Sequence, residues 1–106
     1  MITITIYQKS DIYVGFESKG HAGYGEEGYD IICAAVSALT INTINSIETF
    51  TEDVFTVRQN EGYVKFVLKN PVTNTAVLFL KSMILGLKMI QENYGNKYID
   101  LVYKEV

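Results

Sequence analysis

The chain has 106 residues, of which 48% are hydrophobic, and carries a formal net charge of −3 at pH 7. This length and apolar content predict a single domain, residues 1–106, built around one core. Nine basic side chains against twelve acidic ones provide no general attraction for phosphate backbones or anionic lipid. Nucleic-acid binding and membrane-surface binding are therefore not expected.

The cellular location is predicted from the cysteine content and the N-terminus. The single cysteine, Cys33, cannot form an internal disulfide, and "MITITIYQKSD" has neither the basic nor the continuous apolar region of a signal peptide. The stretches "IICAAVSALTI" and "AVLFLKSMILGL" are shorter than the ~20 residues of a spanning helix, and the second contains Lys81. We expect a cytoplasmic protein without a membrane segment.

The first half of the chain predicts a hairpin and a long helix. Residues 2–7 and 12–17 alternate between apolar and other side chains around the turn "QKSD", which indicates two antiparallel strands with Ile12, Val14 and Phe16 on one face. A glycine-containing loop follows, over residues 19–28. Residues 29–49 lack proline and glycine, and their apolar side chains surround most of the helical circumference. We expect a mostly buried helix there.

The second half predicts the same order again, followed by a strand. Residues 53–69 form two alternating segments around a turn that contains Asn60 and Gly62. Asn70 and Pro71 are typical of a helix start, and the apolar spacing then continues to Ile90, with a helix end at Gly95. "KYIDLVY" predicts the last strand.

The predicted order is ββαββαβ. Two helices can cover only one face of a sheet of about five strands. We therefore expect the α+β class: a two-layer sandwich with a mostly antiparallel sheet and two long helices on one face.

The loop contains "GYGEEG", which matches the GxGxxG pattern of dinucleotide-binding turns. Glu26 and Glu27 would repel a pyrophosphate. The next strands also form a hairpin rather than a parallel βαβ unit. Dinucleotide binding is therefore disfavoured, and no cofactor is expected.

The only histidine and the only cysteine flank this loop. A helix that begins near Tyr29 or Asp30 would place Cys33 in its first turn, where the helix dipole favours a thiolate. His21 could fold back and take the thiol proton, as in a Cys/His dyad. At helical spacing Asp30 and Ser37 share a stripe with Cys33, so both are candidates to orient the histidine or bind substrate.

Other interpretations fit the same residues. A cysteine between "II" and "AA" can be a small core residue, and a histidine after "SKG" can be a solvated loop residue. Asp30 can serve as an acid near the helix start, and Ser37 can bond to its own helix. One histidine and one cysteine leave two of the usual four zinc positions to carboxylates, so no metal site is expected.

The segment resembles the bacterial ribosomal-processing cysteine proteases called Prp. The matching positions run from the loop into the helix: Gly20, His21, Ala22, Gly25, Glu26, Gly28, Asp30, Ile31, Ile32, Cys33, Ala34 and Ser37. The resemblance extends along the whole chain in length and in element order.

The resemblance implies an activity. Members of the family remove the N-terminal extension of a large-subunit ribosomal protein precursor, cutting after paired aromatic residues and before a small residue. They are small α+β sandwiches, usually dimeric, with a mobile segment at the position of residues 21–27 that reorders on substrate binding. The resemblance makes Cys33 the nucleophile and His21 the general base, with Asp30 and Ser37 in supporting positions.

We also expect the loop to contact substrate, its tyrosines meeting apolar residues before the cut and its glutamates steering a basic segment after it. The predicted substrate-binding residues are Gly20, Ala22, Tyr24, Glu26, Glu27 and Tyr29. The alternative hypothesis is a non-catalytic module that associates with the ribosome or binds a small ligand.

Overall fold

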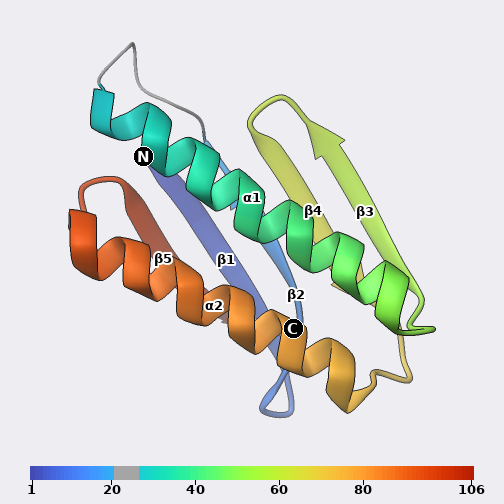
Figure 1. Ribbon diagram of the computed structural model, residues 1–106. Coiled ribbons are helices and arrows are strands. Elements are labelled where there is room, and N and C mark those ends of the chain that lie inside the picture. Colours follow the sequence, from blue (N-terminus) through green and yellow to red (C-terminus); the bar gives the residue numbers. More distant parts are fainter. Residues whose placement is uncertain (21–26) are drawn as a thin grey trace.

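The structure is a computed structural model that describes residues 1–20 and 27–106, without the side chains of residues 27–30. Its elements follow the predicted order (Figure 1): β1 (Ile2–Lys9), β2 (Ile12–Lys19), α1 (Glu27–Phe50), β3 (Phe55–Asn60), β4 (Tyr63–Leu68), α2 (Asn74–Tyr94) and β5 (Ile99–Glu105).

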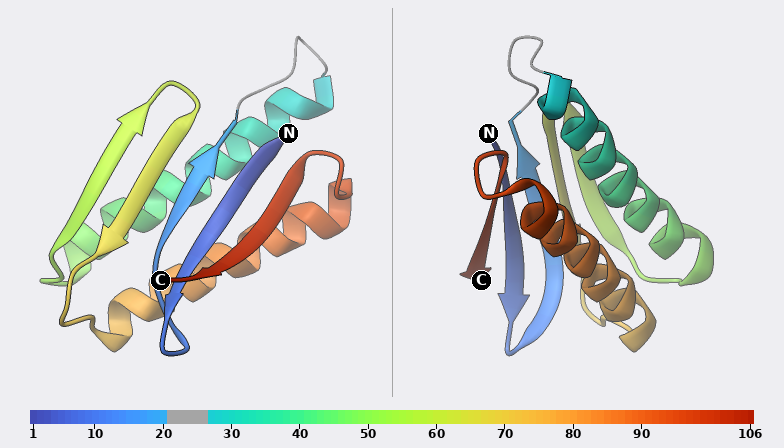
Figure 2. Two further views of the ribbon diagram at one scale, coloured as in Figure 1. Left: turned by 180° about the vertical axis from the view of Figure 1, so that it is seen from behind. Right: turned by 60° about the vertical axis from the view of Figure 1, so that its left-hand side comes forward.

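The five strands form one sheet in the order β3-β4-β2-β1-β5. Three neighbouring pairs are antiparallel, and only β1 and β5 run parallel. Both helices lie on the same face of the sheet, as the edge-on view in Figure 2 shows, and no helix of the described residues covers the other face. The predicted two-layer α+β sandwich with a mostly antiparallel sheet is confirmed.

Helix α1 differs from its prediction in burial. Its buried apolar residues are Ile32, Val36, Ile44 and Ile47, which join the core, whereas Ile31 is 60% exposed. The expectation of a mostly buried helix was therefore wrong. By length and composition alone, the segment Ile31–Phe50 could cross a membrane, and it is longer than the apolar stretch of residues 31–41 considered in the sequence. That it does not span a membrane stays a prediction. Packing of one face against the core accounts for part of this apolar content.

The first hairpin turns more tightly than predicted. Ser10 and Asp11 both have positive φ, 51° and 66°, which matches the twist of a two-residue hairpin turn. The register of β1 and β2 shifts between Tyr7 and Gln8, as at a β-bulge. Beyond this shift the alternation fails. Ile12 is 46% exposed instead of sharing the buried face with Val14.

Helix α2 does not start at Asn70 and Pro71, as the sequence predicted. It starts at Asn74, with Thr73 as the N-cap, because the Thr73 hydroxyl accepts a hydrogen bond from the Ala76 N–H at 3.2 Å. The carboxylate of Asp53 in turn accepts from the N–H and the hydroxyl of Thr73 at 2.9 and 2.5 Å. Gly95 ends the helix at φ 88°, as predicted.

The two helices lie side by side and antiparallel (Figure 1). Helix α2 also packs against β2 and β5, whereas the main packing partner of α1 is α2. A Cβ atom at Gly86 of α2 would lie 3.0 Å from the two terminal methyl carbons of Leu39 on α1. The glycine therefore permits the close approach of the helices at this point.

Candidate active site

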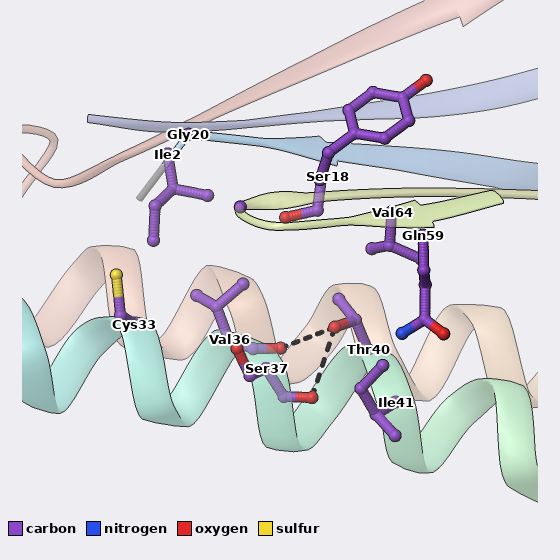
Figure 3. A pocket seen from close by; sticks show the side chains of 12 residues that line it. Ile2, Ser18, Gly20, Cys33, Val36, Ser37, Thr40, Ile41, Gln59 and Val64 are labelled. Atoms are coloured by element: carbon purple, nitrogen blue, oxygen red, sulfur yellow. Dashed lines mark hydrogen bonds between the residues drawn. The ribbon is translucent and has the colours of Figure 1, made fainter. Parts of the chain in front are cut away.

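A cleft of about 350 Å³ lies between α1 and the end of the sheet formed by β2 and the β3–β4 hairpin. Figure 3 shows it from close by, with α1 below and the strands above. Its apolar lining comes from Ile2, Val36, Ile41 and Val64. Cys33 lies at one end and Ile41 at the other, so the cleft follows α1 for about two turns, roughly 12 Å.

Cys33 lines the cleft, is partly buried and packs against the core. In Figure 3 its sulfur points from α1 toward the sheet, on the side where Ile2 and Gly20 lie. Ser37, one helical turn further on, also lines the cleft and is exposed. The structure therefore brings Cys33 and Ser37 to the same cleft, as the helical spacing predicted.

The start of α1 changes one part of the predicted chemistry. The helix begins at Glu27 rather than near Tyr29 or Asp30. Cys33 is therefore almost two turns inside the helix and not in its first turn. Because the favourable effect of a helix N-terminus on an anion is confined to the first turn, it contributes little at Cys33. The helix N-terminus is therefore not a main source of thiolate stabilisation at Cys33.

Gly20 holds the end of β2 at the edge of the cleft. Its φ is +115°, and a Cβ atom there would lie 2.4 Å from the backbone oxygen of Met1, so a side chain would meet both strain and a clash. Its N–H donates to the carbonyl oxygen of Gly62 in the β3–β4 turn at 3.0 Å. These features fix the backbone immediately before His21.

Four polar residues of the cleft were not predicted: Thr40, Ser18, Gln59 and Tyr63. Thr40 is buried and donates its hydroxyl hydrogen bond to the carbonyl oxygen of Val36 at 2.9 Å, with Ser37 O at 3.3 Å. Ser18 is 9% exposed and lies on the core face of β2, and Gln59 extends from β3 toward α1 (Figure 3). A polar residue at position 18, in line with Val14 and Phe16, was the available sequence signal.

Tyr63 also lines the cleft. Its hydroxyl donates to the Glu17 carboxylate at 2.8 Å. That hydrogen bond, with smaller contributions from desolvation and from the Glu17 charge, raises the pKa of Tyr63 above its ordinary value. The phenol therefore stays protonated at neutral pH and cannot act as the base for a thiol.

The remaining predicted site residues fall outside what the structure describes. His21, Ala22, Tyr24 and Glu26 lie outside the described residues, so the pairing of His21 with Cys33 stays a prediction. The backbone of Glu27, Tyr29 and Asp30 belongs to the start of α1, but the structure does not describe their side chains. Among residues 1–20 and 31–106, no three metal-ligating side chains come together.

Comparisons with known proteins agree with the fold. Residues 1–100 match the family model "Cysteine protease Prp". The ribosomal processing cysteine protease Prp of Staphylococcus aureus is 35% identical over 103 residues, which cover 89% of this chain and 96% of that protein.

Two solved structures of the S. aureus protease cover 98% of this chain and 100% of their own. One contains a substrate peptide, with a TM-score of 0.89 and 30% identity. The other contains a covalently linked product peptide, with a TM-score of 0.88 and 31% identity. Both are peptide complexes of the same architecture.

Proposed function

Because this chain belongs to the Prp family of cysteine proteases, we propose that it is an endopeptidase that removes the N-terminal extension of a bacterial large-subunit ribosomal protein precursor. One observation carries the proposal: Cys33 lines a cleft together with Gly20, the residue that directly precedes His21. The covalently linked peptide in the S. aureus structure supports a covalent mechanism in this family.

The proposed reaction proceeds in two steps. His21 takes the proton of the Cys33 thiol as the sulfur attacks the scissile carbonyl carbon, and the resulting imidazolium gives the proton to the departing amine. A thioester then joins Cys33 to the N-terminal fragment. Water hydrolyses this thioester, with His21 accepting a proton from the water, and the free thiol is restored.

His21 carries most of the activation in this proposal. Cys33 is too far inside α1 for the helix N-terminus to favour its thiolate strongly, so an imidazolium beside the sulfur is the main stabilising charge. Asp30 and Ser37 are one turn before and one turn after Cys33. We assign them supporting roles, in orienting His21 and binding the peptide.

The cleft supports a preference for apolar residues before the cut. Its lining along α1 is mainly apolar, and about 12 Å of extended peptide corresponds to three or four residues. We propose that the paired aromatic residues of the precursor bind there, before a small residue at the cut. Tyr24 and Tyr29 add apolar contacts from the loop side, while Glu26 and Glu27 attract the basic segment after the cut.

The proposal includes location and assembly. A ribosomal precursor is processed where it is made, so we assign the activity to the cytoplasm.

We also propose a homodimer, as is usual for the family. An exposed apolar stripe on α2 supports it: Leu78, Leu85 and Met89 are 64%, 61% and 53% exposed. Light scattering of the wild-type chain and of Leu85→Lys tests it, since only the variant should be monomeric.

The deciding experiment is incubation of the purified chain with the full-length ribosomal precursor, followed by mass spectrometry. We expect two fragments, separated after paired aromatic residues, and none with Cys33→Ala. A non-catalytic module would leave the precursor intact. Its cysteine would react with iodoacetamide only on unfolding, whereas an activated Cys33 reacts in the native protein faster than free cysteine does.

A further inference from the structure

The hydroxyl of Ser18 is a buried polar group without a hydrogen bond inside the described part of the chain. Ser18 is 9% exposed and lies on the core face of β2, where its strand partners are Ile4 and Val64. It also lines the cleft that contains Cys33 (Figure 3). Buried hydroxyls nearly always have a partner, because leaving one unpaired costs about 1–3 kcal/mol.

The contrast with Thr40 shows that the cleft does not leave its hydroxyls unpaired in general. Thr40 faces the same cleft from α1 and is 2% exposed, but its hydroxyl donates to the Val36 carbonyl oxygen at 2.9 Å. Ser18 is in a strand, whose carbonyl groups are engaged in the sheet ladder. Its hydroxyl therefore remains available to a molecule that enters the cleft.

The surroundings of Ser18 define the kind of group that fits. The neighbouring lining is apolar, from Ile2, Val36 and Val64. A volume of about 350 Å³ is in the range of sites that hold a small molecule or a large side chain. A side chain with an apolar body and one hydrogen-bonding group at its tip satisfies both features, and tyrosine has this form.

We propose that Ser18 is a specificity-determining residue that pairs with the polar tip of a substrate side chain, so that the cleft prefers tyrosine to phenylalanine at one position of the peptide. The inference rests on the proposed function. Since the cleft extends about 12 Å from Cys33 along α1, this position lies within about four residues of the scissile bond.

The test uses synthetic peptides that span the cut of the ribosomal precursor and differ only by phenylalanine or tyrosine at one position. Cleavage is measured with the wild-type chain, with Ser18→Ala and with Ser46→Ala, a matched loss of a serine hydroxyl on α1 outside the cleft. Peptide affinity is measured separately in a Cys33→Ala background. Thermal unfolding of each variant verifies that it is folded.

At one position we expect the wild-type chain and Ser46→Ala to favour the tyrosine peptide about three- to tenfold, through KM, and the same ratio to appear in the affinities. Ser18→Ala should bring both ratios close to one.

Equal cleavage and equal affinity for both peptides at every position, or a preference that survives Ser18→Ala, would overturn the inference and leave the protease proposal intact. Peptide binding with this preference but without cleavage would overturn the protease proposal alone. Absence of binding would overturn the inference.

Discussion

The two helices begin in contrasting ways. The start of α2 is fixed by a chain of hydrogen bonds, from Asp53 to Thr73 and from Thr73 to the Ala76 N–H. The chain that leads into α1 is anchored at Gly20, which bonds to Gly62 and leaves no room for a side chain. Between Gly20 and α1 the sequence is "HAGYGE", which contains two glycines and one acid but no serine, threonine, aspartate or asparagine that could serve as an N-cap.

The two helices also differ in how they pack against the sheet. The side chains of α2 that face the sheet are closely packed, and its termini are capped. Helix α1 packs mainly on α2, and a cleft remains between α1 and the strands. We infer that changes at α2 act on the free energy of unfolding, whereas changes along the cleft edge of α1 act on cleavage.

The largest expected effect is at Cys33. Cys33→Ala should lower kcat/KM for the precursor by at least about a thousandfold, because the nucleophile is lost, with little change in thermal stability. Cys33→Ser should behave similarly, since a serine hydroxyl is much less acidic. Asn42→Ala, at an exposed position of α1, is the control and should cleave normally. Near wild-type cleavage by Cys33→Ala would refute the assignment.

Gly20 at the edge of the cleft and Gly95 at the end of α2 both have positive φ, so the same substitution can be compared in the two regions. Gly20→Ala places a Cβ 2.4 Å from the Met1 oxygen, whereas at Gly95 nothing lies within 4 Å. Both variants carry backbone strain of about 1 kcal/mol or more. We expect Gly20→Ala to lose additional stability and most of its cleavage, and Gly95→Ala to cleave normally when folded. Chemical denaturation and a cleavage assay at a common temperature measure both. Equal losses of cleavage in Gly20→Ala and Gly95→Ala would contradict the idea that only the cleft region controls cleavage.

The hydrogen bonds between Asp53 and Thr73 predict that the free energy of unfolding depends on pH. Desolvation of Asp53 opposes ionisation, but hydrogen bonds from Thr73 and Thr51 outweigh it and lower the pKa of the carboxyl. A lowered native pKa stabilises the fold above the ordinary carboxyl value of about 4, and the contribution disappears as the pH falls through the native pKa. Asp53→Asn should therefore cost about 0.5–1 kcal/mol at pH 7 and almost nothing in strong acid.

Denaturant titrations of the wild-type chain and Asp53→Asn at several pH values measure this difference. The activity of the folded variant should be unchanged, because Asp53 does not line the cleft. A difference in stability that stays constant down to strong acid would show that the charge of Asp53 is not involved.

The smallest effect is expected where the helices meet. Gly86→Ala improves helix propensity by about 1 kcal/mol but brings a Cβ within 3.0 Å of Leu39, so the two effects should nearly cancel. In a Leu39→Ala background the clash is absent, and Gly86→Ala should stabilise by about 0.5–1 kcal/mol. Equal effects in the two backgrounds would show that Leu39 does not restrict this position.

Regular patterns in the sequence predicted most of the fold. Alternation in β1 and β4 and the 3/4 spacing of α2 give the elements and the covered face, because both patterns report directly on burial. The predicted start of α2 was wrong because the N-cap residue Thr73 is held by hydrogen bonds to Asp53, which is twenty positions away in the chain. Local sequence patterns do not report such a contact. The exposed Ile12 was missed because one shift of register reverses the faces of a strand.

The site was predicted in part. Helical spacing placed Ser37 beside Cys33. Gly20 lines the same cleft, and its predicted role in substrate binding stays a prediction. Part of the opposite wall comes from β3 and β4, which face α1 only in the folded protein. Gln59 therefore had no local signal. The predicted start of α1 was two or three residues too late, so Cys33 lies beyond the first turn of the helix.

The most direct test of the account is the mass of the protein during turnover. The chain is mixed rapidly with a precursor peptide, stopped in acid within a turnover and analysed intact and after digestion. We expect a transient species heavier by the N-terminal fragment minus water, attached to Cys33 and absent from Cys33→Ala. Cleavage without such a species, under conditions where bond cleavage outpaces hydrolysis, or a fragment attached to another residue, would contradict it.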